Sequence, residues 1–165
     1  MKMIEKYYCE HCDKKVDSHV GMGTLDLPVM GRSDITVKSK VRVCDVCGND
    51  CYDPVLDDAF IHKAYDIYRS RHNIIKPAQI KSIRKRYGLS QKNLAILLGW
   101  GEVTITRYET GSLPDDAHNT MLRLLQRPGT MANIVDIHGD RLSQTVRAKL
   151  EKRLAELKEN ATVAN

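Results

Sequence analysis

Two Cys-x-x-Cys pairs, Cys9/Cys12 and Cys44/Cys47, are the residues of this chain whose type and spacing best suit chemistry. Each such turn can place two thiolates on one metal ion, so two turns complete the four-sulfur tetrahedron that zinc accepts. The 31 residues between the pairs exceed the commonest spacing and must form a strand-loop-strand excursion. The pattern therefore predicts one Zn²⁺ per chain. Because all four positions are filled, this zinc should be structural.

Other uses of these side chains are less well supported. A thioredoxin-like redox site is disfavoured because no βαβ pattern surrounds either pair. His11 and His19 are alternative ligands, but each is more often a surface histidine, and Cys51 is expected to be a small, half-buried residue. The chain has no Ser/His/Asp set and no phosphate-binding loop, so we expect no enzymatic activity.

A second signature runs through residues 89–111 and predicts a helix-turn-helix. Leu94, Ala95 and Leu98 would pack inward, Gly99 would allow the turn, and Ile105 would anchor the next helix. In such proteins the start of that second helix enters the major groove. The residues expected to contact DNA are Ser90, Gln91, Lys92, Gly101, Glu102, Val103, Thr106 and Arg107.

These residues have different expected roles. Arg107 can pair with guanine or a phosphate, and Thr106 can donate to a phosphate or touch a thymine methyl group. Ser90 and Gln91 lie at a helix N-terminus, which suits a phosphate. The simpler alternatives are that Ser90 is only a cap and Glu109 only a helix-end partner.

The charge of +5 is unevenly distributed. Residues 1–60 carry 8 Lys/Arg and 11 Asp/Glu, a net of −3, whereas residues 61–113 carry 10 and 3, a net of +7. Residues 114–165 carry 8 and 7, a net of +1. The basic excess on the helix-turn-helix is suited to phosphate, and the acidic front half is suited to a protein partner.

Patterning around these motifs predicts an α+β chain. Residues 35–43 alternate as a half-buried strand, and residues 21–31 indicate a turn or loop between strands. Helices are expected from Pro54 (capped by Asp53), from Pro77, after Ser90, from Gly101 or Glu102, after Asp115, near Met131 and after Ser143.

Four parts follow from this order of elements. We expect a small zinc-bound β module at 1–53, a long connecting helix and linker at 54–76, an all-α helix-turn-helix domain at 77–138, and an amphipathic helix and tail at 139–165. No apolar run is long enough to span a membrane, and the opening residues lack the apolar stretch of a secretory signal. The expected compartment is the cytoplasm.

Taken together, these motifs resemble the zinc-finger/helix-turn-helix antitoxins of the MqsA (YgiT-type) family over residues 7–138. The second half is similar to the lambda-repressor/Cro-type (XRE) helix-turn-helix. The resemblance implies a homodimer that represses its own operon at a palindromic operator in double-stranded DNA, while the zinc domain binds a cognate toxin. The alternative is a zinc-containing DNA-binding regulator with no toxin partner.

Overall fold

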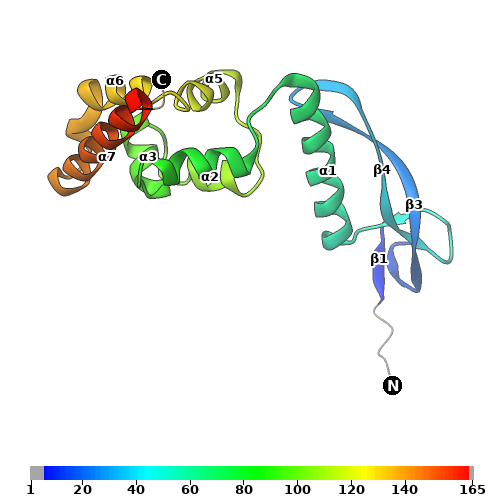
Figure 1. The fold of residues 1–165 in the computed structure, drawn as a ribbon. Helices are drawn as coiled ribbons and strands as arrows, with labels where there is room; N and C mark the ends of the chain where they lie inside the picture. The colour runs from blue at the N-terminus through cyan, green and yellow to red at the C-terminus, as the bar shows by residue number, and fades with distance from the viewer. Residues whose placement is uncertain (1–5, 164–165) are drawn as a thin grey trace. The chain divides into compact units, whose positions relative to one another are not determined.

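The computed structural model describes residues 6–163, so the opening residues 1–5 lie outside the described part. The chain forms two compact units, Met1–His72 and Asn73–Asn165. The first unit combines strands with one helix, and the second is helical (Figure 1). The predicted α+β fold class is confirmed.

The first unit is built on a long antiparallel hairpin. Its strands and helix are β1 (Tyr7–Cys9), β2 (Lys14–Val16), β3 (Ser18–Val29), β4 (Arg32–Cys44), β5 (Asp50–Cys51) and α1 (Pro54–His72). β1 pairs with β2, and a second sheet has the order β3-β4-β5. Helix α1 packs along β4 and β3 (Figure 1). Cys44 lies at the end of β4, and Cys9 lies at the end of β1 beside it.

The predicted loop at residues 21–31 is wrong, because β3 continues through it to Val29. Gly21 and Gly23 account for the wrong prediction. Cβ atoms added at Gly21 and Gly23 would come within 3.0 Å of the Val43 and Val41 side chains, respectively. These glycines therefore make room within a paired strand, and the turn is confined to the residues between β3 and β4.

A buried ion pair joins the start of α1 to the sheet. Asp53 caps the helix by accepting hydrogen bonds from the amides of Val55 and Leu56, which confirms the predicted cap. Its other carboxylate oxygen accepts two hydrogen bonds from Arg42, at 3.0 and 2.8 Å, and the guanidinium lies 4.1 Å from the Tyr7 ring centroid. Burial disfavours the charged carboxylate, but Arg42 and the helix amides lower the pKa of Asp53 below its usual value.

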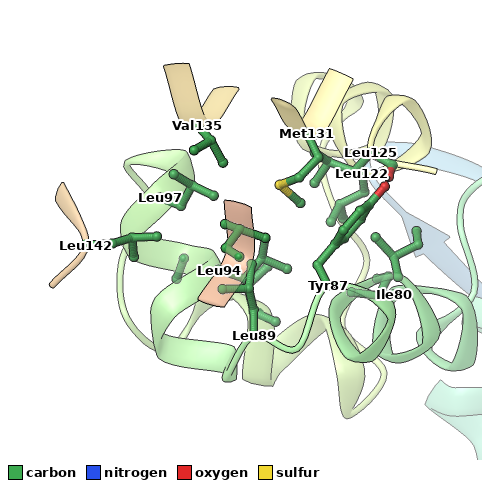
Figure 2. Packing of buried hydrophobic residues seen from close by; sticks show 14 of the residues in the cluster. Ile80, Tyr87, Leu89, Leu94, Leu97, Leu122, Leu125, Met131, Val135 and Leu142 are labelled. Carbon is green, nitrogen blue, oxygen red and sulfur yellow. Dashed lines mark hydrogen bonds between the residues drawn. The ribbon is translucent and has the colours of Figure 1, made fainter. Parts of the chain in front are cut away.

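The second unit is a helical bundle around one apolar core. Its elements are α2 (Pro77–Arg86), α3 (Gln91–Leu98), α4 (Thr104–Glu109), α5 (Asp116–Leu124), α6 (Pro128–His138), the 3₁₀ turn η1 (Gly139–Arg141) and α7 (Gln144–Val163). Figure 2 shows buried side chains of this core pointing toward one another, among them Leu94, Leu122 and Met131. Leu150 and Leu154 are 1% and 5% exposed, so α7 is part of this core.

Two helix starts differ from expectation. α4 begins at Thr104 and not at Gly101 or Glu102, because residues 101–103 form a turn in which the Thr104 amide donates to the Gly101 carbonyl. α6 begins at Pro128, three residues before the predicted start, because proline is favoured in the first helical turn. The caps at Ser90 and Asp115 are confirmed.

Candidate metal site and nucleic-acid interface

Four cysteine sulfurs converge at the end of the hairpin. The Sγ atoms of Cys9, Cys12, Cys44 and Cys47 all lie within 4.8 Å of one another. Cys9 Sγ lies 3.6 Å from Cys47 Sγ, and Cys12 Sγ lies 3.9 Å from Cys44 Sγ. Sulfurs about 2.3 Å from a tetrahedral ion are about 3.8 Å apart, so the cluster fits a tetrahedral metal ion such as zinc.

Hydrogen bonds to sulfur favour the thiolate form that a metal requires. The amides of Val46 and Cys47 donate to Cys44 Sγ at 3.3 and 3.5 Å, and the Asn49 side chain donates to Cys47 Sγ at 3.5 Å. A backbone hydrogen bond from Asn49 lowers the pKa of Cys47 to about 6, whereas the side-chain hydrogen bond with Cys47 raises the pKa of Cys12 to about 12. Gly48 adopts a φ of +75°, which lets the chain turn back past this sulfur.

The other residues considered as ligands lie outside the four-sulfur cluster. Cys51 is 4% exposed and packs against Cys9 and Cys44, and its burial raises the pKa of its thiol to about 11. His19 Nδ1 lies 2.6 Å from Asp45 Oδ1 at the surface, and His11 is exposed. Cys51 is more deeply buried than its sequence suggested, because it closes the small core under the metal site.

The helix-turn-helix consists of α3, a turn at Gly99–Val103, and α4. The Ser90 hydroxyl accepts from the Asn93 amide and caps α3, and Gly99 ends the helix with a φ of +71°. Leu94, Ala95 and Ile105 are fully buried between the two helices.

The residues predicted to read DNA fall into two groups. Gly101, Glu102, Val103 and Arg107 are exposed around the start and outer face of α4, and Val103 is 65% exposed. Arg107 makes no ion pair with any residue in 6–163. Lys92 and Glu102 pair with each other at 3.0 Å across the turn, which brings these two predicted residues together.

Gln91 and Thr106 belong to an internal network that the sequence did not reveal. The Gln91 amide donates to Glu109 at 2.8 Å and accepts from the Thr106 hydroxyl at 3.1 Å. Glu109 in turn accepts two hydrogen bonds from Arg84, at 2.6 and 2.9 Å, and Arg84 also donates to the Leu89 carbonyl. Glu109 is thus not a helix-end partner, because its ion pair reaches α2, 25 residues earlier.

This network fixes α4 against α2 and α3. The Glu109 side chain is 4% exposed and that of Arg84 13%. Burial favours the neutral acid, but the hydrogen bonds from Arg84 and Gln91 lower the pKa of Glu109. Gln91 is therefore held in one orientation at the N-terminus of α3.

An aromatic cluster holds the far side of α4. The Trp100 and His118 rings stack with centroids 3.9 Å apart, and the Tyr108 hydroxyl lies 2.7 Å from His118 Nδ1. Trp100 belongs to the turn, Tyr108 to α4 and His118 to α5, so three elements meet here. The sequence signature contains Trp100 and Tyr108 but gives no signal for His118.

No helix of residues 6–163 is long and apolar enough to span a bilayer.

Comparisons with known proteins place the cysteine cluster and the helix-turn-helix in one family. Comparison with the curated proteins gave no match. The family described as the antitoxin component of bacterial toxin-antitoxin systems, MqsA, matches residues 8–135, which include both the cysteine cluster and the helix-turn-helix. Since this match covers most of the chain, the protein belongs to the MqsA antitoxin family.

Proposed function

We propose that this protein is an antitoxin that represses its own operon, binding operator DNA through the helix-turn-helix and a cognate toxin through the metal-binding unit. It acts as a homodimer on a palindromic operator in the cytoplasm. The observation that carries the proposal is a single family match spanning both the four-cysteine cluster and the DNA-reading motif.

In this proposal the metal is one structural zinc per chain. Cys9, Cys12, Cys44 and Cys47 would hold it, and their sulfur–sulfur distances suit its tetrahedral geometry. Bound by these four cysteines, a zinc ion would link β1 to the end of β4 and would support a small unit whose own apolar core is limited.

DNA reading would rest on the exposed start of α4. Arg107 has the reach and the free guanidinium to contact a guanine or a phosphate, and Val103 offers an apolar contact to a thymine methyl group. The Ser90 end of α3 would face the backbone, where helix amides attract a phosphate. The Arg84–Glu109–Gln91 network would hold α3 and α4 in position.

Toxin binding would rest on the surface of the first unit. Of the large apolar side chains exposed in the described residues, eight lie in this unit and three in the second. The eight are Tyr8, Val20, Met22, Met30, Val46, Tyr52, Val55 and Ile61. Residues 1–60 of this unit carry a net charge of −3, and exposed apolar groups beside acidic ones suit a basic protein partner.

The test separates the two activities in the full-length chain. The variant Arg107→Ala should lose affinity for duplex DNA but still capture the co-expressed product of the neighbouring gene. Two double variants replace exposed apolar side chains of the first unit with serine: Val20→Ser/Met22→Ser and Val46→Ser/Tyr52→Ser. Both should bind DNA normally, and at least one should capture less of the neighbouring gene's product.

Two results would contradict the proposal. If both double variants captured as much of the neighbouring gene's product as the wild type, the toxin site would lie elsewhere. Operator binding with no captured product at all would favour the alternative, a zinc-containing regulator with no toxin partner.

A further inference from the structure

A basic groove lies between the end of α2 and helix α7, outside the helix-turn-helix itself. It has a volume of about 290 Å³. Its lining residues are Tyr87, Gly88, Lys149, Lys152, Arg153 and Glu156. The family match ends at residue 135, so the four residues from α7 belong to a segment beyond it.

The charge of the groove is positive and uncompensated. Arg153 pairs with Glu156 at 2.9 Å and donates to the Arg86 carbonyl at 3.0 Å. These contacts neutralise the one acidic group and fix α7 to the end of α2. Lys149 and Lys152 are exposed and make no ion pair with any residue in 6–163, so two positive charges remain for a ligand.

The helix that carries these lysines is firmly placed. Leu150 and Leu154 are buried in the core of the unit, and Arg147 pairs with Glu151 at 2.8 Å on the same helix. The packing of α7 therefore fixes the backbone that carries Lys149 and Lys152, and both side chains line the groove together with Gly88.

The groove adjoins the part of the fold that meets the DNA backbone. Gly88 precedes the Ser90 cap of α3 by two residues, and consecutive Cα atoms are about 3.8 Å apart, so the two positions lie within about 8 Å. In helix-turn-helix proteins the first helix of the motif crosses the backbone. Each DNA strand carries a charge about every 3.4 Å along the axis, so a strand that runs from Ser90 toward Gly88 would also bring phosphates to the groove.

We infer that Lys149 and Lys152 bind backbone phosphates of the operator at the groove beside Gly88, so that α7 enlarges the DNA contact beyond the helix-turn-helix. The inference rests on the proposed DNA-binding function. The contact carries no base specificity, because it meets only phosphates. It adds affinity and salt dependence to every sequence that the protein binds.

The experiment uses the full-length protein and a duplex selected from random sequences by the wild-type protein. The dissociation constant is measured by fluorescence anisotropy from 50 to 300 mM KCl. Each lost phosphate contact should reduce the slope of log K against log salt by about 0.9. Each protomer of the homodimer would lose two lysines, so the variant Lys149→Gln/Lys152→Gln should lower the slope by about 2 to 4, and the same base sequence should be preferred.

A matched control removes the same charge elsewhere. Lys38→Gln/Lys40→Gln changes two exposed lysines of β4 in the first unit and should leave the slope unchanged. Phosphate-ethylation interference provides the positional test: positions that interfere with wild-type binding beside the α3 contact should stop interfering with the Lys149→Gln/Lys152→Gln variant.

Different failures are distinguishable. If the wild-type protein selects no duplex, the proposed DNA-binding function fails. If it binds and the α7 variant keeps the wild-type slope and interference pattern, only the present inference is overturned. An equal fall in slope for the β4 control would also overturn it, because the effect would then reflect net charge.

Discussion

Removing the Glu109 carboxylate should destabilise the helical unit strongly. In Glu109→Ala, the Arg84 guanidinium would lose both hydrogen bonds to the carboxylate and keep only the Leu89 carbonyl. The side chain of Arg84 is only 13% exposed, so its charge would remain largely buried. Breaking a buried pair in this way costs about 3–5 kcal/mol, a large share of the about 5–15 kcal/mol stability of an ordinary domain.

The single tryptophan makes the measurement specific to this unit. Trp100 stacks on His118, so urea unfolding followed by its fluorescence reports the helical unit regardless of the first unit. The control Glu102→Ala removes a 61% exposed carboxylate paired with Lys92 and should cost less than about 1 kcal/mol. Replacing both partners, Arg84→Met/Glu109→Leu, should recover much of the loss because no buried charge remains.

The loss of stability caused by Glu109→Ala should depend on pH. The pKa of Glu109 is lowered in the folded protein, so its stabilisation is complete above the unfolded value of about 4.3 and is lost as the pH falls through the folded value. The stability difference between wild type and Glu109→Ala should therefore shrink below about pH 4. A Glu109→Ala effect no larger than that of Glu102→Ala at pH 7 would refute the reasoning.

Three further changes test other parts of the structure. Elemental analysis should find about one zinc per wild-type chain and much less in Cys44→Ser, and full zinc retention by that variant would contradict a four-cysteine site. Arg107→Ala should weaken operator binding by about 1–3 kcal/mol and relax the base preference. Lys85→Ala should instead weaken binding to all duplexes and flatten the salt dependence, and gel-shift titration of both variants makes the comparison. Leu150→Ala should destabilise the helical unit by about 2–5 kcal/mol in urea unfolding, because the side chain is 1% exposed, and a near-neutral result would show that α7 is not part of the core.

Local signals in the sequence predicted much of this fold. The paired cysteines, the capping residues Asp53 and Ser90, and the αL turn at Gly99 each depend on a few neighbouring positions. Such features can be read from spacing because their physics is local.

Long-range features could not be predicted in the same way. Gly21 and Gly23 indicated a loop, because only the paired strand reveals the valines that need their space. The Arg84–Glu109 pair joins residues 25 positions apart, and no periodicity marks it. The core position of α7 and the placement of Lys149 likewise depend on packing between distant segments.

The most direct test of the central claim, that this chain is an antitoxin with separate metal-dependent and DNA-reading units, is a growth-rescue assay. The neighbouring gene product is expressed alone, where it should arrest growth, and then together with variants of this chain. Wild type and Arg107→Ala should both restore growth, because neutralisation does not require DNA reading, while Cys44→Ser should not. Failure of the wild-type chain to restore growth would contradict the account.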